Sequence, residues 1–429
     1  MTFESKRLGD VAEIIGGGTP STKDAGNWDG DIPWLTPKDL STFEGVYIGC
    51  GTRSITEQGF KTSSAKMLPT GAVLYTSRAP IGYVAIASNP ISTNQGFKSL
   101  ILKDGYVPEF VFYLLKASKS EIESHASGGT FAEISAKALS DVVLRFPPKV
   151  QQQAISKLLM SLDKKIEANN AISKTLEDIA QTIFKSWFID FDPVKAKMAG
   201  EKPVGMNSAT AALFPGTMEE SELGLIPKGW KAGTIGSLCD SVVNGSTPLR
   251  TNSAFWSSDD ISWFKTGELS DNFLFESKES IAQLALERTS VKVLPRGSVL
   301  MAIYAAPTVG RLGILTKSAT FNQACTGMVP KDGFGTPYLY LTLFNRRIWF
   351  NSLAIGAAQQ NISKVIVEGC PALTAPQDVH DAFLEITQPL FAHIEALSSQ
   401  SNSLVLIRDS LLPRLISGEL PIPEEMLAS

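Results

Sequence analysis

Two long segments of the chain carry the hydrophobic spacing of an amphipathic helix. From Gln151 to Trp187 there is neither Gly nor Pro, and apolar residues recur in steps of mostly three and four. These residues are Ile155, Leu158, Leu162, Ile166, Ile172, Leu176, Ile179, Ile183 and Trp187. The second segment carries Leu390, Ile394, Leu397, Leu404, Ile407, Leu411 and Leu415. Narrow apolar seams of this length predict two coiled-coil helices that pack on each other.

Pro389 bears on where the second helix begins. Proline has no N–H to donate and breaks a hydrogen bond in a helix interior. We therefore expect the second long helix to begin near Pro389.

The stretches before each helix have a different pattern. Runs such as Ala72–Thr76 and Ser298–Ala302 have the composition of strands, and clusters of Gly, Pro, Asn and Ser separate them. This pattern predicts two mixed globular domains of the α/β (α+β) class.

The two domains share an internal sequence repeat. Gly17, Thr19 and Pro20 recur as Gly245, Thr247 and Pro248, an offset of 228, and Trp28 recurs as Trp256. At offsets within two of 228, further matches are Asp31-Ile32-Pro33-Trp34 with Asp260-Ile261-Ser262-Trp263, Lys66–Pro69 with Lys292–Pro295, Asn94-Gln95 with Asn322-Gln323, and Ile134-Ser135 with Ile362-Ser363. A register kept over such a distance indicates a duplication, and hence a pseudo-two-fold internal repeat.

We divide the chain accordingly. The predicted parts are a first domain (1–148), a first long helix (149–190), a linker rich in Pro, Gly, Met, Ala and Glu (191–229), a second domain (230–376), and a second long helix with the C-terminal tail (377–429). We expect the two helices to be antiparallel and to separate the two domains.

Composition excludes several classes of protein. With 43% hydrophobic and 19% charged residues, the chain resembles a soluble globular protein, and no stretch approaches the roughly 18 apolar residues of a membrane span. We therefore expect a cytoplasmic protein without a membrane partner. The four Cys and three His residues show no spacing typical of a metal site, and we predict neither a metal nor a disulfide.

The net charge of −4 does not indicate a nucleic-acid partner, because proteins that bind nucleic acid usually present a basic surface. Residues 230–376 nevertheless hold 13 Lys and Arg against 10 Asp and Glu, whereas residues 377–429 hold 2 against 8. Any surface that binds phosphate must therefore be local.

Sequence motifs for catalysis are absent. The chain contains no GxxxxGK[ST] loop, no HExxH and no Asn/Asp-Pro-Pro-aromatic stretch of the kind that adenine methyltransferases use. Asp271, Glu276 and Lys278 imitate a nuclease signature, but such triplets are common. Gly16–Gly18 could form an anion-binding nest, although a turn at a strand end is the preferred interpretation.

Three segments in this order resemble a known family. They are Pro147-Pro148 followed by Gln151-Gln152 and the first helix, Leu223–Trp230 (LGLIPKGW), and Leu411–Gly418 (LLPRLISG). Over essentially the whole chain, the sequence resembles the specificity subunits of type I restriction-modification systems.

The resemblance implies a division of labour. Two target recognition domains would each bind one half of a split, asymmetric double-stranded DNA site, and the helices would fix the gap between the halves. Family members assemble with two adenine-specific methyltransferase subunits and with two motor-nuclease restriction subunits. The chain itself would be non-catalytic and hold no cofactor, since S-adenosylmethionine, ATP and Mg²⁺ serve the partner subunits.

Candidate DNA contacts are polar and basic residues at turns of the repeat. Arg, Asn and Gln can pair with base edges, whereas Lys mostly contacts phosphate. The candidates are Thr36, Lys38, Arg78, Lys98 and Thr130 in the first domain, and Arg250, Lys265, Tyr304, Arg311, Gln359, Gln360 and Lys364 in the second. Asn94, Gln95, Asn322 and Gln323 also fit, but their recurrence favours a shared structural role.

Other interpretations stay open from the residues alone. The chain could be a tandem scaffold that binds protein or carbohydrate, or a nuclease that uses Asp271, Glu276 and Lys278. The aromatic cluster of Phe184, Trp187 and Phe188 could dock a methyltransferase, although core packing is favoured.

Overall fold

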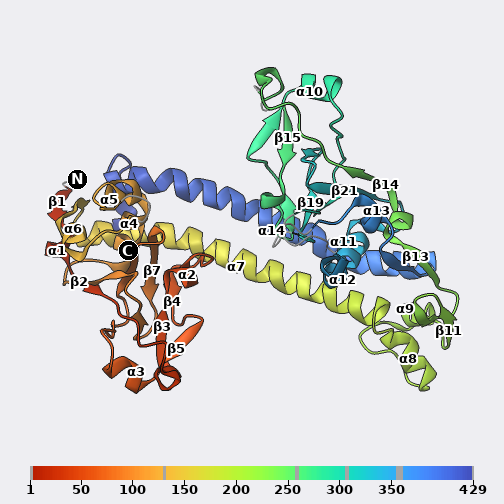
Figure 1. Cartoon of the computed structure of the whole chain (residues 1–429), viewed down its shortest axis with the longest axis horizontal. Coiled ribbons are helices and arrows are strands. Elements are labelled where there is room, and N and C mark those ends of the chain that lie inside the picture. The colour runs from red at the N-terminus through yellow and green to blue at the C-terminus, as the bar shows by residue number, and fades with distance from the viewer. Residues whose placement is uncertain (1–2, 129–131, 257–259, 305–308, 354–360, 428–429) are drawn as a thin grey trace. The chain divides into compact units, whose positions relative to one another are not determined.

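The structure, a computed structural model, describes residues 3–128, 132–256, 260–304, 309–353 and 361–427. It divides into two compact units, residues 1–169 with 400–429 and residues 170–399. Each unit therefore joins one β-rich domain to the beginning of one long helix and the end of the other (Figure 1).

Three sheets build the β-rich part of the first unit. A five-stranded sheet has the order β2-β9-β6-β7-β4, a three-stranded sheet has the order β5-β3-β8, and β1 pairs with β10. The strands are β1 (Glu4–Arg7), β2 (Ala12–Gly16), β3 (Trp28–Leu35), β4 (Tyr47–Ile48), β5 (Arg53–Ile55), β6 (Val73–Ser77), β7 (Ile81–Ala87), β8 (Ser92–Thr93), β9 (Lys98–Leu102) and β10 (Val143–Phe146).

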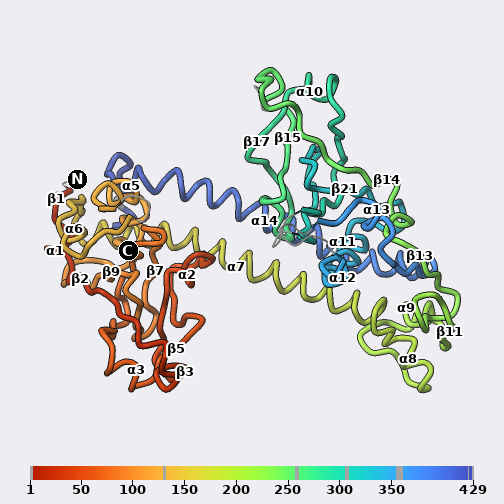
Figure 2. The backbone as a smooth tube through the Cα atoms, in the orientation of Figure 1, coloured from red at the N-terminus to blue at the C-terminus, as the bar shows by residue number. Residues whose placement is uncertain are grey.

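The second unit repeats this topology strand for strand. Its sheets have the orders β14-β21-β18-β19-β16, β17-β15-β20 and β13-β22, and Figure 2 shows β17 beside β15. The strands are β13 (Lys231–Thr234), β14 (Cys239–Asn244), β15 (Ile261–Phe264), β16 (Asn272–Leu274), β17 (Glu279–Ile281), β18 (Val299–Ala302), β19 (Leu312–Leu315), β20 (Thr320–Phe321), β21 (Cys325–Pro330) and β22 (Pro371–Thr374). The predicted duplication and fold class are confirmed.

Register agrees as well as strand order. In the first unit Val73 pairs with Leu100, and in the second Val299 pairs with Met328, as expected for residues offset by 226 and 228. Every residue of β6 and β18 is buried, which matches their uninterrupted strand-like composition.

Short helices complete each domain. Pro108 begins α4, where its fixed φ suits the first turn, and six consecutive residues of this helix, Phe110–Leu115, are buried. The helices of the first domain are α1 (Leu8–Val11), α2 (Pro37–Leu40), α3 (Glu57–Lys61), α4 (Pro108–Ala117), α5 (Lys119–Glu123) and α6 (Ala136–Asp141). Those of the second are α10 (Gln283–Arg288), α11 (Gly335–Asn345), α12 (Arg347–Leu353) and α13 (Lys364–Glu368), and α15 (Glu424–Leu427) follows near the C-terminus.

Two helices of about forty residues follow the domains, α7 (Lys149–Phe188) and α14 (Gln377–Ser417). The expectation that the second begins near Pro389 is wrong, because α14 starts twelve residues earlier and passes through this proline. Proline costs the helix one hydrogen bond. The apolar residues on both sides, Phe383 and Phe391, are buried in the core of the second unit, and this packing holds the helix across the gap. Among the described helices, none combines the length and apolar character that a bilayer span requires.

The two long helices are antiparallel within each unit. In the first unit Asp163 pairs with Arg408, and Asn169 donates to Gln400 at 2.8 Å, so the contacts move backward along α14 as they advance along α7. In the second unit Phe184 and Phe188 lie against Phe383 at ring distances of 6.0 and 5.0 Å. The antiparallel pairing predicted from the sequence is confirmed in both units.

The buried side of α7 differs in part from the predicted seam. Ile172 and Ile179 are each 43% exposed, whereas Leu159, Ala180 and Phe184 are buried. Each half of α7 packs against its own β-rich domain as well as against α14, so burial follows two local environments and not one continuous stripe.

The ends of the two helices occupy equivalent places. Leu412, Leu415 and Ile416 are buried in the core of the first unit. Subtracting 228 from their numbers leads to Phe184, Trp187 and Phe188, which are buried in the core of the second unit. In each unit, the long helix that ends there therefore packs three equivalent side chains into the core. These side chains are aliphatic in the first unit and aromatic in the second.

The connection between the repeats is ordered and belongs to the second unit. It contains α8 (Asp192–Met198), α9 (Ser208–Ala212) and the hairpin β11 (Met218–Ser221) and β12 (Gly224–Pro227). Val194, Phe214 and Ile226 are buried in that unit's core. The sequence of the segment, rich in Pro, Gly, Met, Ala and Glu, gives no sign of these anchors, because three spaced apolar residues make no periodic pattern.

His380 makes the stability of the second unit sensitive to pH. Its ring is fully buried, its Nε2 accepts a hydrogen bond from the Ala375 N–H at 3.1 Å, and burial lowers its pKa from 6.5 to about 4. Between these values the unfolded chain binds the proton and the folded chain does not, so stability falls as the pH falls through this window.

We expect acidification from pH 7 to pH 4.5 to cost up to about 3 kcal/mol through this residue. The residue at the equivalent place in α7 is Gln152, a neutral side chain with an amide acceptor. His380→Gln should therefore reduce the dependence of the melting temperature on pH. Equal pH slopes for the variant and the wild type would contradict this assignment.

Candidate nucleic-acid interface

A pair of tryptophans stands at the same place in each β-rich domain. Trp28 and Trp34 meet edge to face at 5.1 Å, and Trp256 and Trp263 do so at 5.0 Å. The indole N–H of the second tryptophan of each pair donates to a backbone oxygen, that of Gly18 or of Ser246. These repeated contacts are structural, because they tie the three-stranded sheet to the glycine turn in both domains.

Each tryptophan pair carries an arginine, but from a different position. The Arg53 guanidinium lies 3.7 Å from the ring centre of Trp28, and that of Arg250 lies 3.8 Å from Trp256. Arg53 is the β5 partner of Trp34, whereas the β17 partner of Trp263 is Glu279. The equivalent positions thus hold opposite charges, and a residue from another turn supplies the second arginine.

Two predicted DNA contacts of the second domain are bound to that glutamate. Arg250 and Lys265 both form ion pairs with Glu279, and the hydrogen bond from Lys265, followed by that from Arg250, lowers the pKa of Glu279. One carboxylate therefore already holds both cations and orients them.

A similar arrangement involves two predicted contacts of the first domain. Arg78 Nη1 lies 3.4 Å from Glu133 Oε2, and Lys98 Nζ lies 3.6 Å from Oε1 of the same carboxylate. Arg78 and Glu133 also line an open cleft of about 530 Å³ together with Ala79, Pro80, Ile81, Glu123 and Ala132. Two cations share one acid here, and Glu123 adds a second carboxylate to the lining of the cleft.

The other predicted contacts have varied surroundings. Thr36 caps α2, since its backbone N–H and its hydroxyl both donate to Asp39 at 2.7 Å, whereas Lys38 on the same helix is exposed. Tyr304 is half-buried and forms a backbone bridge with Asn361, and the Arg311 carbonyl accepts the Ala302 N–H.

Lys364 pairs with Glu368 at 3.2 Å and borders an open depression of about 650 Å³ with Thr247, Lys292 and Gln323. Thr130, Gln359 and Gln360 lie outside the described residues. The structure thus brings Arg78 to Lys98 and Arg250 to Lys265, and whether these residues contact DNA stays a prediction.

The repeated Asn-Gln pair has the structural role that its recurrence favoured. The Asn94 side chain accepts the Gly96 N–H at 2.8 Å, and Gln95 accepts from Thr19. In the second domain Asn322 accepts the Ala324 N–H, and Gln323 accepts from Thr247.

The glycine turn is likewise structural. A Cβ on Gly17 or Gly245 would lie 2.1 Å from the carbonyl oxygen of Asn94 or Asn322, so the turn requires glycine for close packing.

The nuclease alternative also weakens, because both carboxylate oxygens of Asp271 are held by Arg347. Within the described ranges, no group of three or more His, Cys, Asp and Glu side chains is placed to hold a metal.

Sequence reasoning missed the acids. Glu133 and Glu279 decide which cations are neutralised, but each acts on partners 14 to 55 residues away. The only available signal was the comparison of the two repeats, which aligns Glu279 with Arg53.

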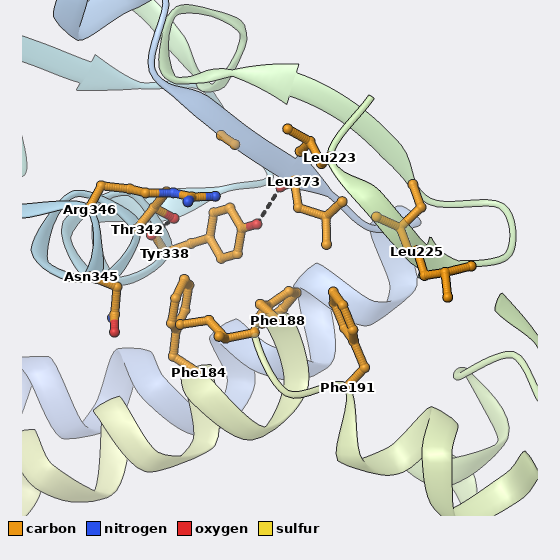
Figure 3. Close-up of a pocket in the computed structure, with 13 residues that line it drawn as sticks. Phe184, Phe188, Phe191, Leu223, Leu225, Tyr338, Thr342, Asn345, Arg346 and Leu373 are labelled. Atoms are coloured by element: carbon orange, nitrogen blue, oxygen red, sulfur yellow. Dashed lines mark hydrogen bonds between the residues drawn. The ribbon is translucent and has the colours of Figure 1, made fainter. Parts of the chain in front are cut away.

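A separate apolar pocket of about 280 Å³ lies at the end of α7 (Figure 3). Phe184, Phe188 and Phe191 form one wall, Leu223 and Leu225 of the linker hairpin another, and the Tyr338 hydroxyl donates to the Leu373 carbonyl. Phe184, Trp187 and Phe188 are each at most 5% exposed, so core packing, the favoured interpretation of this cluster, agrees with the structure.

Comparison with known proteins bears on the interface. Residues 1–178 and 227–369 match the family described as type I restriction modification DNA specificity domain. The chain is 33% identical to the type I restriction enzyme MjaIX specificity subunit of Methanocaldococcus jannaschii, over 98% of this chain and 94% of that protein. It is 28% identical to the HindI specificity subunit of Haemophilus influenzae, over 73% of this chain and 78% of the relative.

A solved structure supports the fold. The crystal structure of the type I restriction-modification S subunit from M. genitalium has a TM-score of 0.56 and 13% sequence identity, and the match covers 97% of this chain and 96% of that one. The tandem, duplicated architecture is thus shared with a protein of very different sequence.

Proposed function

Because the chain belongs to the family of type I restriction-modification specificity subunits, we propose that its two β-rich domains each bind one half of a split, asymmetric site on double-stranded DNA. The two half-sites differ in sequence because the two domains present different polar side chains from the same scaffold.

The partner subunits carry out the chemistry in this proposal. Specificity subunits of type I systems work with methyltransferase and restriction subunits and with DNA. We propose two methyltransferase subunits and two motor-nuclease subunits for this chain, with S-adenosylmethionine, ATP and Mg²⁺ bound by them. The chain itself neither methylates nor cuts DNA.

One observation carries the proposal beyond family membership. The strand order and the Trp pairs are repeated, yet the charged groups on them are rearranged: Arg53 faces Trp34, and Glu279 faces Trp263. A duplicated structural protein would have no need to vary these groups, whereas a reader of two different sequences must vary them.

The charge balance favours a small number of phosphate contacts. The net charge is −4, and four of the cations predicted to contact DNA are already paired with Glu133 or Glu279. Phosphate contacts release counterions, so binding must weaken as salt rises, but with a modest slope.

The decisive experiment is to map adenine methylation across host DNA with and without this gene. A split, asymmetric motif that disappears on deletion and returns on complementation supports the proposal. Purified chain with S-adenosylmethionine but no methyltransferase subunit should transfer no methyl group. Methylation that persists unchanged in the deletion strain, or transfer by the isolated chain, would contradict it.

A further inference from the structure

One position of the scaffold has the same backbone but unrelated side chains in the two domains. Arg78 and Glu133 form an antiparallel bridge, and Tyr304 and Asn361 form its counterpart. The residues beside each bridge confirm the match: the Ile134 N–H donates to the Ser77 carbonyl at 3.0 Å, and the Ile362 N–H donates to the Ile303 carbonyl at 2.9 Å.

The neighbouring strands extend the match. Lys98 pairs with Gly16 at the end of β2 and β9, and Thr326 pairs with Asn244 at the end of β14 and β21. Arg78, Lys98 and Glu133 in the first domain therefore correspond to Tyr304, Thr326 and Asn361 in the second.

The two sets differ in charge. The first set presents two cations and one carboxylate. The second is uncharged: Thr326 is buried and donates to the Asn244 side chain at 2.8 Å, while Asn361 is exposed. This contrast differs from the Trp pairs and the Asn-Gln turns, which are the same in both domains and hold the fold.

Arg78 and Glu133 of the first set line open space, whereas in the second set Asn361 is exposed and residues beside the set line a depression. Arg78 and Glu133 line the cleft of about 530 Å³ in the first domain. In the second, Asn244 lines the depression of about 650 Å³, as does Lys364, three residues after Asn361. A group that contacts a ligand must reach such a space, whereas a core residue need not.

The Arg78 ion pair is suited to exchange. The side chains of Arg78 and Glu133 are 39% and 40% exposed and separated by 3.4 Å. Pairs of this kind contribute little to stability. Glu133 therefore positions the guanidinium through a weak ion pair. The pair can break, and the guanidinium N–H groups can then turn toward a base edge.

We infer that Arg78 reads a guanine in one half-site, positioned by Glu133, and that Asn361 reads an adenine in the other. Arg can donate both its hydrogen bonds to guanine O6 and N7, and Asn can pair with adenine N6 and N7 in the major groove. The inference rests on the proposed function and assigns part of its specificity to a bridge whose backbone pairing is the same in both domains but whose side chains differ.

The test uses the full complex with its methyltransferase subunits and maps methylated adenines genome-wide. Arg78→Gln should lower the preference for guanine at one position of one half-site about tenfold, and should favour adenine there, which Gln can pair with. Asn361→Ala should relax an adenine in the other half-site alone.

Arg7→Gln is the matched control, because Arg7 pairs with Asp141 at 3.3 Å, much as Arg78 pairs with Glu133. This variant should leave both half-sites unchanged. If Arg78→Gln does not fold, Glu133→Gln carries the test: it keeps Arg78 but should weaken discrimination at the same position, while overall DNA binding rises because a negative charge is lost.

Failure of the inference and failure of the proposed function are distinguishable. If the wild-type complex yields no split adenine motif, the proposed function fails. If the wild type yields the motif but Arg78→Gln reduces methylation equally at all sequences, Arg78 contacts phosphate and the inference is overturned. An unaltered first half-site with Glu133→Gln, in a complex that folds normally, overturns the positioning role.

Discussion

A fragment of residues 1–200 should form a symmetric dimer. In the intact chain, Leu412, Leu415 and Ile416 of α14 close the core of the first unit, and the fragment lacks them. The exposed apolar surface would drive association. A second copy can cover it with the end of its own α7, because Phe184, Trp187 and Phe188 stand at the equivalent positions.

Such a dimer would carry two identical recognition domains related by a true two-fold axis. With the methyltransferase present, the fragment should therefore direct methylation to a palindromic split motif made of one natural half-site in inverted repeat. Sedimentation would give the oligomeric state, and mapping of modified adenines would give the motif. A stable monomer, or a motif that keeps both natural halves, would contradict the interchange of the two units.

The fit in this dimer should be imperfect. Three aromatic side chains would enter sites that hold leucine and isoleucine in the intact chain, and overpacking of this kind costs about 1–3 kcal/mol. The fragment with Phe184→Leu, Trp187→Leu and Phe188→Ile should therefore dimerise more tightly than the natural fragment. Weaker association of this variant would show that the aromatic residues find a different place.

Asp163→Ala should destabilise the first unit by about 3 kcal/mol, the low end for a broken buried ion pair, because Arg408 keeps a second carboxylate partner, Asp409. Asp163 is 8% exposed in its side chain and pairs with Arg408 at 2.7 Å, and its other oxygen accepts from the Tyr113 hydroxyl. Removal of the carboxylate leaves the Tyr113 hydroxyl without its acceptor and leaves the largely buried guanidinium with Asp409 as its remaining ion-pair partner. Hydrogen exchange should rise most in residues 149–169 and 400–417, where the two helices pair.

The chain supplies two controls for this variant. Lys174 and Asp178 form an exposed pair on α7 at 2.7 Å, so Asp178→Ala should cost less than about 1 kcal/mol. In the second unit the positions equivalent to Asp163 and Arg408 are Phe391 and Ala180, both buried and apolar. Asp163→Phe combined with Arg408→Ala should therefore recover much of the loss. Equal destabilisation by Asp163→Ala and Asp178→Ala would show that the buried pair contributes nothing special.

The arrangement of the buried pair explains why it could not be predicted. Asp163 and Arg408 lie 245 residues apart, and neither stands in a motif. An amphipathic pattern shows that a helix has a buried face, but not which partner residues meet on it. The exposed Ile172 and Ile179 illustrate this limit, since the periodic spacing placed them in the seam.

The sequence by itself determined the duplication, the two long helices and the family. These features leave local marks: residues in register at an offset of 228, an apolar repeat free of Gly and Pro from Gln151 to Trp187, and short segments such as Leu223–Trp230. Periodicity reflects backbone geometry within one element, so it can be read without knowledge of the rest of the chain.

Only the tertiary structure decided which groups surround each candidate contact, where the second long helix begins and how the linker packs. Glu133 and Glu279 bind the cations that the sequence offered as free DNA contacts, α14 continues through Pro389, and the linker packs Phe214 into a core. Each of these outcomes depends on groups brought together from distant parts of the chain, where burial and charge pairing outweigh local preference.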